Sequence, residues 1–164
     1  DYAADLGLVV ERPADARIDA LPLRRQRLLL LVPQRHRLYR APQVNLSALA
    51  GETFVVRDSG STTQRVFDAC LAQCGVAIRI GLRVGSREAV REAVIQGLGL
   101  GVVSDVGFVP GPTLAGIPFA EPGMVTHAHL IWLASRRDAR MIRSFADHAR
   151  AMPLCPAPSR AGGG

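Results

Sequence analysis

The stretch Ser86-Arg-Glu-Ala-Val-Arg-Glu-Ala-Val-Ile-Gln-Gly97-Leu-Gly99-Leu-Gly101-Val-Val-Ser104 decides the fold of this chain. Ser86 is placed to cap a helix, because its hydroxyl can accept a hydrogen bond from an N–H group of the first turn. Alanine and valine then recur at helical spacing, which gives the helix one apolar face. Gly97 ends the helix, and the apolar run up to Ser104 is typical of a strand buried on both faces. With an alternating strand before it, residues 78–84, the stretch predicts a β-α-β unit and a parallel sheet.

A second unit of the same kind lies upstream, with a strand expected at residues 53–56 and a helix from residue 62 to Gly75. Between them is a loop of hydroxyl side chains and a glycine. Free N–H groups at a helix start bind anions, and ligands of open α/β sheets gather at the carboxyl ends of strands. The candidate ligand-binding residues are therefore Ser59, Gly60, Ser61, Thr62 and Thr63. The alternative is that Ser61 or Thr62 only caps its own helix.

Composition limits the function classes. A chain of 164 residues with 48% hydrophobic residues can form one domain or two small lobes. No apolar run of about 18 residues predicts a membrane span. The net charge of +6 comes entirely from scattered arginines, with no lysine and only 5% aromatic residues. A nucleic-acid-binding surface would need clustered cations and stacking rings, so the sequence does not favour one within this segment.

No motif indicates catalysis, a metal or a cofactor. Gly-x-Ser-x-Gly, P-loop and His-Glu-x-x-His patterns are all absent from the sequence. Cys70 and Cys74 are four residues apart on one helix face, which suits either core packing or two metal ligands, and packing is favoured. His127 and His129 have strand spacing, which predicts a surface face, with metal binding as the alternative.

The remaining segments predict further elements around these units. Strands are expected at residues 5–10, 28–32 and 129–134, a helical turn at 46–51 and a short extended segment at 114–119. Ser135 is placed to cap a last helix, with Asp138 in its first turn. The buried face expected for that helix consists of Met141, Ile142, Phe145, Ala146, Ala149 and Met152. Prolines and glycines from Pro153 onward predict a disordered tail.

The order of these elements resembles the effector-binding domain of LysR-type transcriptional regulators over about residues 5–150. The segment Leu31-Val-Pro-Gln-Arg-His-Arg-Leu38 is similar to the crossing between lobes in that family, although Arg37 replaces the usual proline, and the turn at 46–52 also matches. Within the family, Ser86–Val94 and Gly101-Val-Val-Ser104-Asp105 look like the branch associated with aminoethylphosphonate catabolism. The segments Thr126-His127 and Ala134-Ser-Arg-Arg137 fit that branch too.

The resemblance implies an α/β fold like that of the type 2 periplasmic binding proteins, with two lobes and a mixed sheet in each. Residues 1–35 would belong to lobe I, 36–112 to lobe II and 113–152 to lobe I again, followed by a tail at 153–164. Lobe I would be incomplete, because the chain looks truncated at its N-terminus. Apolar strand edges would then be exposed, so the segment alone is expected to be poorly stable.

The resemblance also implies a cytoplasmic, oligomeric regulator with no enzyme activity. A small anionic effector, in this branch a phosphonate, would bind between the lobes, and a preceding winged helix-turn-helix would contact DNA. By position, Ser61, Thr62 and Thr63 would donate to the effector, with Ser86 and Ser104 bordering the cleft.

Two other protein classes remain as alternatives. A solute-binding protein of a transporter shares the fold. An aspartic protease would use Asp58-Ser-Gly-Ser61, but that class needs strands to follow the loop, whereas residues 62–74 have helical periodicity.

Overall fold

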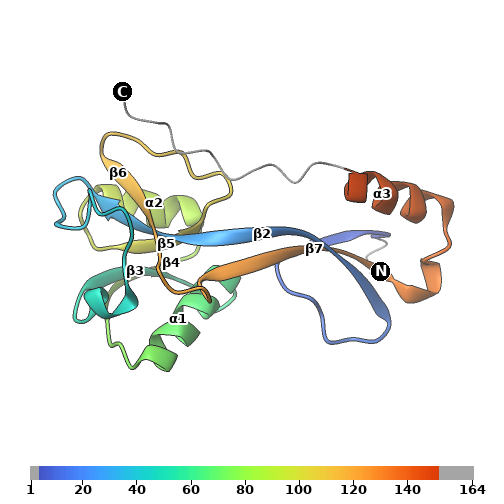
Figure 1. Ribbon diagram of the computed structural model, residues 1–164, viewed down its shortest axis with the longest axis horizontal. Coiled ribbons are helices and arrows are strands. Elements are labelled where there is room, and N and C mark those ends of the chain that lie inside the picture. The colour runs from blue at the N-terminus through green and yellow to red at the C-terminus, as the bar shows by residue number, and fades with distance from the viewer. Residues whose placement is uncertain (1–3, 152–164) are drawn as a thin grey trace. The chain divides into compact units, whose positions relative to one another are not determined.

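The computed structural model describes residues 4–151 and divides the chain into two compact units (Figure 1). Unit 1 comprises Asp1–Arg25 and His127–Gly164, and unit 2 comprises Gln26–Thr126. The predicted mixed α/β class is confirmed, since both helices and sheets are present. The predicted lobe boundaries at 35/36 and 112/113 stay a prediction, and the expected tail lies outside the described residues.

The sheet of unit 2 is built on the two predicted β-α-β units. Strand β3 (Thr53–Arg57) pairs in parallel with β4 (Arg79–Val84), and a parallel bridge between Phe54 and Leu100 places β5 (Gly101–Ser104) beside the other edge of β3. Strand β2 (Ile18–Pro33) then pairs antiparallel with both β5 and β6 (Leu114–Pro118). The order across unit 2 is therefore β4-β3-β5-β2-β6, with only β2 antiparallel to its neighbours.

Helices α1 (Thr62–Cys74) and α2 (Arg87–Ile95) cover opposite faces of this sheet (Figure 1). Alternate residues of each strand point to opposite faces, so one strand supplies two cores. On the α1 face, Phe67 packs on Phe54 with ring centroids 5.2 Å apart. On the α2 face, Val90 and Val94 pack against Val103. The β-α-β prediction is confirmed on both sides.

The turn between α2 and β5 depends on glycines for steric reasons. A Cβ on Gly101 would lie 2.6 Å from Val90 Cγ1, so the bare glycine lets α2 approach the sheet. Gly99 has φ +153° and a Cβ there would lie 2.7 Å from the carbonyl oxygen of Thr53. Only glycine combines that backbone conformation with so close an approach.

Unit 1 contains strands β1 and β7, the first part of β2 (residues 18–25) and the last helix. Strand β1 (Gly7–Val9) pairs antiparallel with β7 (Val125–Leu133), followed by the 3-10 turn η2 (Ala134–Arg136) and helix α3 (Arg140–Ala151). Arg136 forms an ion pair with Asp5, and Arg137 forms another with Asp19, with 3.1 Å between Arg137 Nε and Asp19 Oδ2.

Two expectations for α3 are wrong. Ser135 lies inside η2 and does not cap α3, which begins at Arg140. Met141 and Phe145 are 65% and 54% exposed, so of the expected face only Ile142 and Ala146 are buried. Met152 lies outside the described residues. A one-sided apolar pattern predicted the helix, but it could not predict what covers each position.

The expected start of β2 is also wrong. The strand begins at Ile18, ten residues before the expected position, because arginines at 24, 25 and 27 hide its apolar alternation. The turn η1 (Leu46–Leu49) is confirmed. Within residues 4–151, no helix is long and apolar enough to cross a membrane.

Candidate functional site

The sequence-predicted site residues follow three neighbouring parallel strands. Loop residues 59–61 and the start of α1 come after β3, Ser86 comes after β4, and Ser104 is the last residue of β5. Carboxyl ends of parallel strands meet at one edge of a sheet. The helices after β3 and β4 lie on opposite faces, so the connections change direction here, which is where α/β sheets bind ligands. The structure therefore brings the three groups to one edge of unit 2.

The start of α1 combines a capped and an open set of N–H groups. The Ser61 hydroxyl accepts a hydrogen bond from the Gln64 N–H at 3.3 Å, and the Thr62 hydroxyl accepts one from Arg65 at 3.1 Å. This hydrogen bond shows that Ser61 caps its own helix, which was the alternative for this residue, and its side chain is buried. In the part of the chain that the structure describes, the N–H groups of Thr62 and Thr63 have no acceptor.

The loop before α1 is exposed at its tip and fixed at its base. Ser59 and Gly60 are exposed, and a side chain at Gly60 would meet no atom within 4 Å. The Ser61 N–H donates to the Asp58 carbonyl at 2.9 Å, and the Asp58 N–H donates to Val84 of β4 at 3.3 Å. Open space therefore lies at the tip, while the backbone on either side is held in place.

Gln64 is a positioning residue that the sequence reasoning missed. Its side chain is 5% exposed, and its Oε1 accepts the Arg57 N–H at 3.0 Å while its Nε2 donates to Asp68 at 2.8 Å. The amide thus ties the end of β3 to the first turns of α1. No sequence signal distinguishes it, because a glutamine early in a helix normally faces solvent.

Arg57, the last residue of β3, is a further candidate residue at this edge. Its Nη2 donates to the Gly85 carbonyl at 3.0 Å, and its own carbonyl accepts from Arg83 at 3.0 Å. Its Nε is buried and has no hydrogen-bond partner among residues 4–151. A guanidinium with an unused, desolvated N–H is a donor that a ligand can satisfy.

The other two strand ends contribute one exposed and one buried serine. Ser86 caps α2 as predicted, with its exposed hydroxyl accepting the Ala89 N–H at 3.1 Å. Ser104 is 8% exposed and lies in the ladder opposite Leu28. Next to it, the Asp105 carboxylate has a buried Oδ1 with no partner in the described part of the chain. The edge therefore offers acceptors as well as donors.

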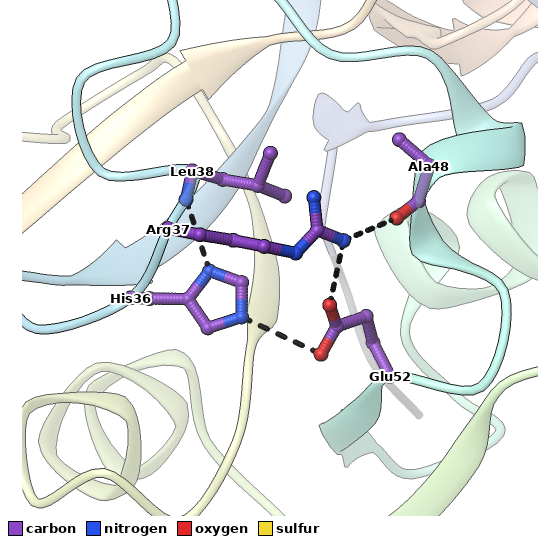
Figure 2. A network of polar contacts seen from close by, with 5 residues as sticks. All are labelled: His36, Arg37, Leu38, Ala48 and Glu52. Atoms are coloured by element: carbon purple, nitrogen blue, oxygen red, sulfur yellow. Dashed lines mark hydrogen bonds and ion pairs between the residues drawn. The ribbon is translucent and has the colours of Figure 1, made fainter.

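A separate polar cluster, made of His36, Arg37 and Glu52, fastens the segment after β2 to the segment after η1 (Figure 2). Arg37 donates to the Ala48 carbonyl and to Glu52 Oε1, both at 2.8 Å, and His36 Nε2 lies 3.4 Å from Glu52 Oε2. Because His36 Nδ1 accepts the Leu38 N–H at 3.3 Å, the neutral ring carries its proton on Nε2, toward Glu52. The cluster therefore links these two segments of unit 2.

The remaining titratable candidates do not form a metal site. Cys70 is buried and Cys74 is exposed, so core packing holds for Cys70, and the expectation for Cys74 is wrong. His127 is exposed and alternates with the buried Ala128 along β7, as predicted for a surface face. Within residues 4–151, no group of three or more His, Cys, Asp or Glu side chains could hold a metal ion.

The sequence matches the family described as "LysR substrate binding domain" over residues 1–153. A curated relative, the RuBisCO operon transcriptional regulator of Allochromatium vinosum, is 35% identical over 102 residues, which are 62% of this chain and 34% of the relative. The chain therefore spans about a third of the length of that regulator.

Solved structures of the same fold include two regulators. The CcmR regulatory domain of Synechocystis PCC6803, in complex with 2-PG, has a TM-score of 0.80 at 24% identity, covering 91% of this chain and 73% of that one. HinK, a LysR family transcriptional regulator from Pseudomonas aeruginosa, has a TM-score of 0.76 at 26% identity, covering 89% of this chain and 52% of that one. The predicted fold of type 2 periplasmic binding proteins is confirmed.

Proposed function

We propose that this chain, which belongs to the family of LysR substrate-binding domains, is the effector-sensing part of a transcriptional regulator. The relatives named above are regulators and not enzymes, which favours this function over a transporter's solute-binding protein. The aspartic-protease alternative fails on the fold, because residues 62–74 after Asp58 form helix α1 and not strands.

One observation supports an anionic effector most directly. At the edge formed by β3 and β4, the N–H groups of Thr62 and Thr63 and the Nε of Arg57 all lack acceptors within the described residues. Backbone N–H groups at a helix start and a guanidinium are the donors that bind carboxylate and phosphate oxygens. We therefore keep residues 59–63 together with Ser86 and Ser104 as the proposed site, and add Arg57.

The proposed effector is a small zwitterion of the 2-aminoethylphosphonate type. Its phosphonate would accept hydrogen bonds from the α1 start and Arg57, and its ammonium group would need an acceptor. Asp105 offers one, since its buried Oδ1 has no partner in the described part of the chain. An unpaired carboxylate at an otherwise anion-binding edge favours a ligand that carries both charges.

Effector binding would act on DNA through the rest of the regulator. We propose that a winged helix-turn-helix belonging to the complete protein contacts the promoter and that the protein is an oligomer. The effector can shift the balance between two arrangements of the regulator only by the difference between its affinities for them.

Calorimetric titration of the complete regulator tests this proposal. The ligands are 2-aminoethylphosphonate and ethylphosphonate, which lacks the amine. Replacing Arg57 by methionine is expected to weaken binding about tenfold or more, since it removes charge-assisted hydrogen bonds. Replacing Thr62 and Thr63 together by alanine removes their hydroxyls but keeps their backbone N–H groups, so it should weaken binding less. The control Ser47→Ala removes an exposed hydroxyl from η1 and should leave the affinity unchanged.

Three results would contradict the proposal in different ways. Equal affinity in the wild type and in both variants would place the effector elsewhere. If neither 2-aminoethylphosphonate nor ethylphosphonate produces heat on titration, this class of ligand is discarded. Tight binding of ethylphosphonate, equal to that of the aminated ligand, would remove the role given to Asp105.

A further inference from the structure

A cavity lies on the α2 face of unit 2, beside the segment that follows β5. Its volume is about 350 Å³, which is within the range of small-molecule sites. The lining residues come from β2, α2, the end of β5 and the loop after it: Leu31, Arg87, Glu88, Arg91, Val103, Ser104, Gly107, Phe108, Val109 and Pro110. All of them belong to unit 2.

The floor and one wall of the cavity are apolar and fixed. Leu31 and Val103 belong to the buried cluster on this face of the sheet, and Phe108 packs against that cluster. Gly116 of β6 leaves room for the Phe108 ring, since a Cβ there would lie 2.4 Å from Phe108 Cε1. Because Gly116 has no side chain, the Phe108 ring can pack against the sheet, where it forms one apolar wall of the cavity.

The charged rim has one unbalanced cation. Arg87 is engaged twice, because its Nη1 donates to the Val106 carbonyl at 2.9 Å and its Nε lies 3.9 Å from Glu88. Arg91, one turn further along α2, has no ion pair or hydrogen bond from its side chain among residues 4–151. The Arg87–Glu88 pair is neutral, so the rim carries a single net positive charge at Arg91.

We propose that this cavity is a binding site for a small amphipathic monocarboxylate. Its apolar body contacts Leu31, Val103 and Phe108, and its carboxylate pairs with Arg91. A guanidinium binds a carboxylate through two parallel hydrogen bonds, and the apolar walls supply the surface that a ring or short alkyl chain buries. A dianion would leave one charge unpaired here, so a single carboxylate is the class that fits.

This site differs from the proposed effector site in chemistry and shares only one residue with it. The effector site uses N–H groups of the α1 start and Arg57, whereas this cavity uses α2 and the loop after β5. Ser104 is the residue common to both. The two sites can therefore be tested separately, and the failure of one proposal leaves the other standing.

Titration of the isotopically labelled complete regulator with phenylacetate, followed by backbone amide NMR, tests the proposal. Phenylacetamide, which has the same shape without the charge, is the neutral comparison. Saturable shifts confined to α2, residues 103–110 and Leu31 are expected with phenylacetate. Its affinity should exceed that of phenylacetamide at least tenfold.

Variants on the rim separate the site from nonspecific attraction. Arg91→Gln should weaken phenylacetate binding about tenfold, whereas Arg79→Gln, at an exposed arginine of β4, should leave it unchanged. Val109 lines the cavity and is 73% exposed, so Val109→Asp, which adds a negative charge at the rim, should weaken phenylacetate binding more than the uncharged, similarly sized Val109→Asn. The double variant Thr62→Ala with Thr63→Ala should bind phenylacetate like the wild type.

The proposal is overturned by any of three outcomes. These are no saturable shift with phenylacetate, equal binding of the acid and the amide, or binding that Arg91→Gln and Arg79→Gln weaken equally. A thermal unfolding curve of each variant confirms that a lost signal does not come from an unfolded chain.

Discussion

Glu52 accepts a 2.8 Å hydrogen bond from Arg37 (Figure 2). Arg37 stands where the crossing segment of LysR-type regulators usually has proline. Partial burial alone raises the pKa of the Glu52 carboxyl. The hydrogen bonds from Arg37 and His36 outweigh burial, so the pKa falls below its ordinary value of 4.5. An arginine at this position therefore replaces a conformational restraint by an electrostatic one.

Loss of this contact is expected to destabilise the chain in a pH-dependent way. Glu52→Gln should lower the free energy of unfolding by about 1 kcal/mol at neutral pH, a modest value because Arg37 is 58% exposed. Since the folded-state pKa is depressed, the contribution is fully present above pH 4.5 and disappears as the pH falls through the folded-state pKa. Urea unfolding of both proteins between neutral and acidic pH measures this difference, with exposed Glu92→Gln as the control. A difference that stays constant into acid would contradict it.

The close approach of α2 to the sheet predicts a large effect at Gly101. Gly101→Ala places a Cβ 2.6 Å from Val90 Cγ1 and 3.0 Å from Val94 Cγ2, both buried. Overpacking of this kind costs about 1–3 kcal/mol. Gly111→Ala is the matched control, because nothing lies within 4 Å of that Cβ. Chemical denaturation should separate the two variants clearly, and equal midpoints would refute the packing argument.

The cap of α2 predicts a residue-specific rescue. Ser86→Ala removes the acceptor of the Ala89 N–H and should cost about 1 kcal/mol. Ser86→Asp keeps an acceptor and adds a negative charge at the positive end of the helix, so its stability should match or exceed that of the wild type. Thermal unfolding of the three proteins checks the order. If alanine and aspartate were equally harmful, the hydroxyl would have no capping role.

The two cysteines of α1 should differ in reactivity. Burial raises the pKa of the Cys70 thiol, and the nearby Cys74 and Glu121 raise it further. The thiolate is the reactive form, so Cys70 should resist iodoacetamide at neutral pH, whereas the exposed Cys74 should be alkylated first. Peptide-resolved mass spectrometry over a time course measures both rates. Comparable rates in the folded chain would show that the α1 face opens readily.

Local sequence signals were sufficient for the β-α-β units. Ser86, the alternating valines and alanines, and Gly97 act within one turn of their own helix, so a short window contains the whole cause. The first part of β2 was missed, because its stability comes from partners far along the chain. The start of α3 was misplaced, because a 3-10 turn competed with a plausible serine cap.

The candidate site stays a prediction, and the structure adds residues to it that the sequence patterns do not indicate. Hydroxyls after β3 indicate the loop of the proposed site, and the structure shows that the Ser61 hydroxyl is used by its helix cap. Arg57 and Gln64 depend on contacts to Gly85, Asp68 and each other, which no periodicity encodes. Buried polar residues of this kind are found only when the fold is known.

The Gln64 amide makes the loop after β3 and the start of α1 a single stiff part. With Oε1 held by the Arg57 N–H and Nε2 held on Asp68, neither the strand end nor the helix can shift without breaking a buried contact. If the effector binds at the loop tip as proposed, a displacement of the loop would be transmitted to the 13-residue helix α1. An effector that contacts only a few atoms of this loop would in this way also change the position of the C-terminal end of α1.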